Sequence, residues 1–264
     1  LPHPNAWPYR YTLDREACPD GCQACVEVCA YDAIDLDAKA REETIEVGST
    51  VVATGWHAYP LEKLPELGGG TLPNVISNVQ MERLASKTGP TGGQIQRPSD
   101  GESPKKVAFV QCAGSRDENH LPYCSYICCM ASLKQATYVR ERYPDAKIYI
   151  FYIDLRTPGY RYERFYEKIK EDENIFLIKG KVAEVSADAG SQNITVVAEN
   201  AVTGEKIHQS AEMVVLATGM VPNGIDAKLP FELEFDNGTA PAARWLSEVL
   251  RVCHDTPRTQ REDA

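Results

Sequence analysis

Apolar residues along the chain gather in nearly continuous runs that are separated by amphipathic and polar stretches. Residues 106–112 (KVAFVQC) and 147–155 (KIYIFYIDL) have the pattern of strands that are covered on both faces. Between them, residues 126–143 repeat apolar side chains at near-helical steps, and Pro144 ends the pattern. Strand, helix and strand in this order predict a βαβ unit with a parallel strand pair.

The remaining pattern predicts shorter elements around this unit. We expect a hairpin over residues 31–56, from a strand at AIDL to a buried strand, and a helix near residues 78–87. A short helix and a meander of strands should follow the unit, at residues 161–172, 175–187, 193–199 and 205–220. From about residue 235 the strand pattern is lost, which predicts a flexible tail with one helix near residues 242–252.

Two segments of the chain repeat one another. EETIEVGSTVVATGW (42–56) and EKIHQSAEMVVLATGM (205–220) both run from a polar strand through a short break into a buried strand that ends in Ala-Thr-Gly. One copy would be ordinary in a buried strand, but two copies with matching approaches favour a functional interpretation. A glycine lets the backbone approach a flat ligand closely, and ligands of open α/β sheets bind at strand ends.

Charge and cysteine content narrow the function classes. The 264 residues carry a net charge of −10, which argues against nucleic acid as the main partner. No apolar run approaches the roughly 20 residues of a membrane helix, and there is no export signal, so we expect a cytoplasmic protein without a membrane span. Eight of the nine cysteines form two clusters, which in this context favours metal over disulfides.

The first cluster has the spacing Cys18-x3-Cys22-x2-Cys25-x3-Cys29. It is similar to the bacterial ferredoxin run C-x2-C-x2-C-x3-C-P, except that the first gap is one residue longer and Ala30 replaces proline. In two-cluster ferredoxins the fourth cysteine is a ligand of the other cluster, so Cys29 could belong to a neighbouring cluster while Cys18, Cys22 and Cys25 hold this one. Structural zinc is the alternative, but zinc motifs usually split into two separated pairs.

The second cluster comprises Cys112 at the end of a predicted strand and Cys124, Cys128 and Cys129 at the start of the following helix. A helix N-terminus favours thiolates, and its N–H groups can donate to cluster sulfurs. We interpret these residues as ligands of a [4Fe–4S] cluster; the alternative is a set of small buried side chains. The connecting turn has a single glycine, Gly114, so no phosphate cradle for a nicotinamide cofactor is evident.

The Ala-Thr-Gly ends that flank the βαβ unit resemble those of two-dinucleotide-domain flavoprotein reductases of the thioredoxin-reductase type. The resemblance implies an α/β fold of the FAD/NAD(P)-binding kind with bound FAD. The flavin would lie along residues of both repeats, namely Ala53, Thr54, Gly55, Trp56, Ala217, Thr218 and Gly219. The G-x-G-x-x-G fingerprint for the FAD pyrophosphate is absent, and in that family it precedes this region. We therefore expect an incomplete fold.

Stretches across residues 1–235 resemble the family of the heterodisulfide reductase A subunit: NVISNVQMERL, GPTGGQIQRPSDG, VAFVQCAGSRD, PYCSYICCMASLKQA and IFYIDLRTPG. The resemblance implies electron transfer between FAD and [4Fe–4S] clusters without NAD, with clusters on both cysteine groups. It implies the other subunits of a membrane-associated oxidoreductase complex as partners. In the quinone-linked members of the family, such complexes connect the menaquinone pool with adenylylsulfate reductase at the inner face of the membrane.

This family's organisation predicts five regions. Residues 1–40 form a ferredoxin-like segment, and residues 41–105 form part of an FAD-binding domain with a connector. Residues 106–204 form an NAD(P)-type domain that carries the second cysteine cluster. Residues 205–235 return to the FAD-binding domain, and residues 236–264 form an atypical tail. The alternative function is a zinc-stabilised structural or interaction protein that keeps the reductase fold without its chemistry.

Overall fold

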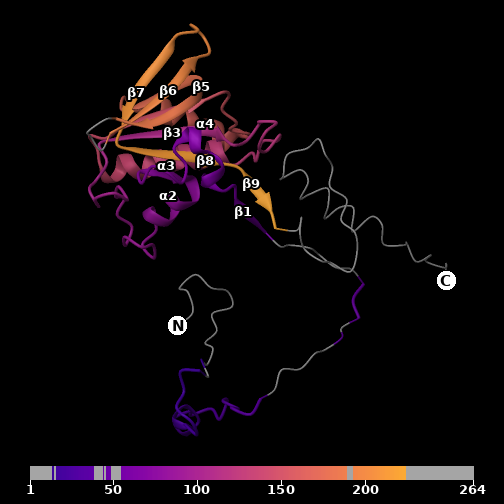
Figure 1. Ribbon diagram of the computed structural model, residues 1–264. Coiled ribbons are helices and arrows are strands. Elements are labelled where there is room, and N and C mark those ends of the chain that lie inside the picture. Colours follow the sequence, from indigo (N-terminus) through magenta and orange to yellow (C-terminus); the bar gives the residue numbers. More distant parts are fainter. Residues whose placement is uncertain are drawn as a thin grey trace, which may run out of the picture. The chain divides into compact units, whose positions relative to one another are not determined.

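The computed structural model describes residues 14, 16–38, 44, 46–48, 55–188 and 193–223 (Figure 1). The chain divides into two compact units, Leu1–Thr50 and Val51–Ala264, each of which is described by itself. The expected tail helix near residues 242–252 and most of the second strand of the expected hairpin lie outside the described residues.

The described residues of the first unit include one short helix, α1 (Ala24–Glu27), which contains Cys25. The prediction of a strand at residues 33–36 is wrong, because these residues are described and form none. At these residues, local turns form in place of the predicted strand. Asp32 has a left-handed backbone with φ 49°, and the Asp35 carboxylate accepts a hydrogen bond from the Asp37 N–H at 2.9 Å.

A seven-stranded sheet in the order β2-β8-β3-β4-β5-β6-β7 organises the second unit. Its strands are β2 (Val75–Ser77), β3 (Lys106–Ala113), β4 (Lys147–Tyr152), β5 (Ile175–Ala187), β6 (Ile194–Asn200), β7 (Lys206–Ala211) and β8 (Met213–Thr218). The five neighbouring strands β2, β8, β3, β4 and β5 pair in parallel, and β5, β6 and β7 form an antiparallel meander. The predicted α/β class and the parallel pair of the βαβ unit are confirmed.

Helices cover one face of this sheet, as Figure 1 shows for α2 and α3 beside β3 and β8. The helices are α2 (Asn78–Ala85), α3 (Cys128–Arg142) and α4 (Tyr160–Lys170), and two 3-10 turns, η1 (Leu61–Lys63) and η2 (Pro65–Leu67), precede β2. A capping box formed by Ser77 and Gln80 starts α2. Helix α3 starts two residues later than predicted, because Tyr126 has a left-handed backbone with φ 62°.

The alternation of side chains along β3 separates two apolar cores. Val107 and Phe109 face the helices and pack with Leu133 of α3, whereas Ala108 and Val110 face the meander. Covering on both faces explains why β3 is a continuous apolar run in the sequence.

A separate two-stranded ribbon joins the two repeats. It pairs β1 (Trp56–Ala58) with β9 (Met220–Pro222) in antiparallel orientation. The Tyr59 N–H donates to the Gly219 carbonyl at 2.8 Å, and the Asn223 N–H donates to the Gly55 carbonyl at 3.1 Å. Gly55 therefore lies beside Asn223 at one end of the ribbon and Gly219 lies beside Tyr59 at the other end, while Ala53 and Thr54 lie outside the described residues. Among the described helices, none is long and apolar enough to cross a membrane.

Candidate functional site

An irregularity at the end of β3 aims Cys112 toward the start of α3. The pairing of β3 with β8 shifts register between Val110 and Ala113, and Cys112 has a left-handed backbone with φ 58°. Regular alternation would place Cys112 with Val110 on the meander face. A bulge re-aims a side chain, and the Cys112 thiol interacts electrostatically with those of Cys124 and Cys129.

The other three cysteines of this group approach from the loop before α3 and from its first turn. The Cys124 thiol accepts a hydrogen bond from the Tyr126 N–H at 3.4 Å. The thiol of Cys128 donates to the Thr218 carbonyl at 3.6 Å, and that of Cys129 approaches the Asp154 carbonyl at 3.9 Å. The structure therefore gathers the predicted residues Cys112, Cys124, Cys128 and Cys129 where β3, β8 and β4 end.

Burial dominates the acid–base behaviour of these thiols. Burial and the neighbouring thiols of Cys129 and Cys112 raise the pKa of Cys128 to about 12, and burial with Cys129 raises the pKa of Cys112 to about 11. Burial also raises the pKa of Cys129. Such thiols are neutral at pH 7, whereas metal ligands must be thiolates. A cationic centre is needed to turn the buried thiols of Cys112, Cys128 and Cys129 into thiolates.

Two guanidinium groups lie at the rim of the cysteine group. Arg116 contacts Cys112 and pairs with Asp154 at 2.7 Å between Nη1 and Oδ1. Arg156 lies 3.6 Å from the same carboxylate and stacks over the Tyr126 ring at 5.2 Å. Both positive charges would offset the negative charge of a thiolate-bound centre.

Four thiols are a donor set that a [4Fe–4S] cluster uses. In the part of the chain that the structure describes, no group of three or more His, Cys, Asp or Glu residues is arranged to hold one metal ion. Zinc requires its four ligands around one centre, with Zn–S near 2.3 Å. A [4Fe–4S] cluster distributes its four thiolates over separate irons and so accommodates a wider group.

The first cysteine group, Cys18, Cys22, Cys25 and Cys29, is built from local contacts and is half-buried. The Cys22 N–H donates to the Pro19 carbonyl at 3.1 Å, and the Ala33 N–H donates to the Cys29 thiol at 3.4 Å. Hydrogen bonds from the N–H groups of Ala33 and Tyr31 lower the pKa of Cys29. The segment therefore presents at least one sulfur already surrounded by N–H donors, as a cluster ligand requires.

The structure gives the second Ala-Thr-Gly end a packing role. The side chains of Ala217 and Thr218 are buried in the sheet. A Cβ on Gly219 would meet Ser115 Oγ and would lie 2.6 Å from Leu121 Cδ1 and 3.1 Å from Ser125 Oγ, so side chains of the loop that carries Cys124 would have to shift to admit it. Trp56 is 43% exposed beside Gly55 and offers a ring to a flat ligand. Contact of these residues with a flavin stays a prediction.

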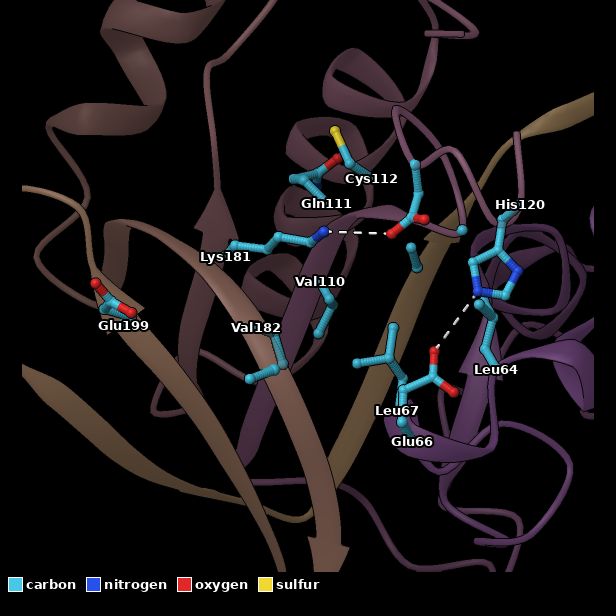
Figure 2. Close-up of a pocket in the computed structure, with 14 residues that line it drawn as sticks. Leu64, Glu66, Leu67, Val110, Gln111, Cys112, His120, Lys181, Val182 and Glu199 are labelled. Carbon is cyan, nitrogen blue, oxygen red and sulfur yellow. Dashed lines mark hydrogen bonds and ion pairs between the residues drawn. The ribbon is translucent and has the colours of Figure 1, made fainter. Parts of the chain in front are cut away.

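A cavity of about 420 Å³ borders Cys112 on the meander side of the sheet (Figure 2). At one end Lys181 pairs with Asp117 at 3.3 Å. At the other end His120 Nδ1 lies 2.9 Å from the Tyr59 hydroxyl, and His120 Nε2 lies 4.0 Å from Glu66. The sequence pattern does not indicate this arrangement of Tyr59, His120 and Lys181, because only the fold brings these distant residues together.

Proteins similar in sequence to this chain are named as A subunits of heterodisulfide reductases. Over 224 residues the chain is 42% identical to the A subunit of H2:CoB-CoM heterodisulfide,ferredoxin reductase from Methanothermobacter marburgensis, covering 84% of this chain and 34% of that protein. It is 42% identical over 192 residues to the second iron-sulfur A subunit of CoB–CoM heterodisulfide reductase from Methanopyrus kandleri, covering 72% and 29%. For the iron-sulfur A subunit of the Methanocaldococcus jannaschii enzyme the identity is 36% over 230 residues, covering 87% and 35%.

Among solved structures, thioredoxin reductases align with part of the chain. Those of T. acidophilum and Lactococcus lactis align at 14% identity with TM-scores of 0.40 and 0.43. These alignments cover 72% and 79% of this chain, and 49% and 64% of the respective reductase chains. No protein-family model matches the chain. The chain spans about a third of the length of its curated relatives and is homologous to that part of the heterodisulfide reductase A subunit.

Proposed function

We propose that this chain is the electron-transfer part of an oxidoreductase subunit that carries FAD and two [4Fe–4S] clusters. The observation that carries the proposal is the gathering of Cys112, Cys124, Cys128 and Cys129 around the first turn of α3. In a dinucleotide-binding unit this place would hold phosphate, and here four thiols occupy it. The unit thus has ligands for an electron carrier in place of a nicotinamide cofactor.

Each cofactor has its own set of residues in this proposal. Cys112, Cys124, Cys128 and Cys129 hold one cluster, and Cys18, Cys22, Cys25 and Cys29 hold the other. The flavin lies beside the β1–β9 ribbon, against the residues of both Ala-Thr-Gly repeats. Support for the flavin comes from the repeat itself and from the exposed ring of Trp56 beside Gly55.

For the biological setting, we favour the flavoprotein A subunit of the quinone-interacting membrane-bound oxidoreductase (Qmo) complex. The support is the sequence resemblance of residues 1–235 together with relatives that are named as reductase subunits. In this setting the chain would work with the other subunits of the complex at the cytoplasmic face of the membrane. It would link menaquinol to adenylylsulfate reductase in sulfate reduction.

Anaerobic purification followed by quantitation of iron, acid-labile sulfide, zinc and flavin tests the proposal. Two clusters give about eight irons and eight sulfides per chain, and one cluster gives about four of each. Zinc without sulfide would leave the zinc-stabilised structural protein as the function. Tight NADH binding would contradict the assignment of the α3 N-terminus to a cluster.

A further inference from the structure

Buried side-chain donors without partners are concentrated beside the second cysteine group. Among the described residues, the buried and unpaired donor atoms are Nε2 of Gln111 and the hydroxyls of Ser115 and Ser132. The exposed fractions of these residues are 6%, 5% and 0%. A buried donor without a partner is costly, so three of them in one region require an explanation such as a ligand that accepts hydrogen bonds.

Each of these donors lies close in the chain to one or two of the cysteines of the second group. Gln111 immediately precedes Cys112 in the β3 bulge, and Ser115 follows it in the same turn. Ser132 lies one helical turn beyond Cys128 and Cys129 in α3. Gln111 lines the same cavity as Cys112 (Figure 2), and Ser132 belongs to α3, so the two donors belong to the strand and the helix that carry the cysteine group.

We infer that Gln111 and Ser132 are hydrogen-bond donors to the sulfurs of the cluster held by Cys112, Cys124, Cys128 and Cys129, and that they set its reduction potential. The inference rests on the proposed function. Cluster sulfurs are acceptors, and hydrogen bonds to them are among the factors that set the potential. A donor stabilises the reduced cluster more than the oxidised one, because the reduced cluster is more negative. Both residues therefore raise the potential, and they act through the cluster without being ligands.

The test is a potentiometric titration of the anaerobic, cluster-loaded full chain, followed by electron paramagnetic resonance. Gln111→Leu removes the amide at similar volume, and Ser132→Ala removes the hydroxyl in a helix that tolerates alanine well. Each variant should shift the potential of the Cys112 cluster to more negative values by about 59 mV, which is a tenfold change in a one-electron equilibrium. The cluster of Cys18 to Cys29 should keep its potential in both variants and serves as an internal reference.

Gln135→Leu is the matched control. Gln135 is also buried in α3, but its Nε2 already donates to the Asn78 carbonyl at 2.9 Å and to Glu82 at 3.1 Å. This variant should lose stability without moving the potential. Ser132→Thr keeps the hydroxyl and should keep the wild-type potential.

Three outcomes would overturn the inference. Unchanged potentials in Gln111→Leu and Ser132→Ala at full cluster content would reject the donors while leaving the proposed function intact. An equal shift in Gln135→Leu would assign the effect to general packing. Absence of iron and sulfide at the Cys112 group in the wild-type chain would reject the proposed function and the inference together. If Gln111→Leu fails to fold, the pair Ser132→Ala and Ser132→Thr decides.

Discussion

The two cysteine groups use the same side chains but are constructed differently. Cys18 to Cys29 are brought together by one short stretch with the four-residue helix α1. Cys112, Cys124, Cys128 and Cys129 are brought together by the end of β3, a loop and the start of α3. The first group depends on local turns, and the second depends on the packed sheet. The difference predicts that the two sites respond separately to mutation.

Removing one ligand from each group should have the largest effect. We expect Cys112→Ala to lose about four irons and four sulfides per chain and to keep the other cluster. Cys18→Ala should give the converse result. Iron and sulfide analysis with electron paramagnetic resonance measures both, and Cys253→Ala, at the cysteine outside both groups, is the control. Loss of both clusters from either single variant would show that the sites do not form independently.

In the metal-free chain, the thiols of the two cysteine groups should differ in their rates of alkylation, which is the next largest effect. The pKa of Cys29 is lowered by backbone N–H groups, and the pKa of Cys128 is raised to about 12 by burial and neighbouring thiols. Only the thiolate is alkylated, so at pH 8 Cys29 should react faster than Cys128 by more than about tenfold. The reaction of Cys128 should rise as the pH approaches its pKa.

Peptide mapping by mass spectrometry after timed iodoacetamide exposure provides the measurement. Urea-unfolded protein is the control, because unfolding should bring both cysteines to similar rates. Equal rates in the folded, metal-free chain would contradict the difference in burial between the two groups.

A methyl group added at a glycine should also affect the two regions differently, through a smaller change in the free energy of unfolding. A Cβ at Gly219 would meet Leu121 and Ser125 of the cysteine loop, whereas a Cβ at Gly48 would meet no atom of the described residues within 4 Å. We expect Gly219→Ala to lower the free energy of unfolding by about 1–3 kcal/mol. Gly48→Ala should change it by less than about 0.5 kcal/mol. Urea denaturation measures both values, and equal effects would mean that the loop adapts to the added methyl group.

The same contrast explains what could be predicted from the sequence. The strands β3, β4 and β8 were predictable because strands covered on both faces are continuous apolar runs. The spacing of Cys18 to Cys29 also suggested a site directly, because such a site is local. The bulge at Cys112 and the cavity beside it were not predictable, because they depend on register with β8 and on contacts with Tyr59 and Lys181.

The smallest predicted effect concerns a contact between the cysteine loop and a residue far from it in the sequence. It tests whether such contacts stabilise the second cysteine group. The Tyr59 hydroxyl meets His120 Nδ1 at 2.9 Å, and this contact ties the cysteine loop to the segment after the first repeat. Tyr59→Phe keeps the ring and removes the hydroxyl, so the free energy of unfolding should fall by about 1 kcal/mol. Tyr160→Phe is the control, because that residue is 72% exposed and its hydroxyl only accepts a 3.5 Å contact from Arg164. Thermal and urea unfolding of both variants measure the difference. A cost for Tyr59→Phe no greater than for Tyr160→Phe would mean that the loop is held by its own turns, as the first cysteine group is, and would remove the contrast between the two sites.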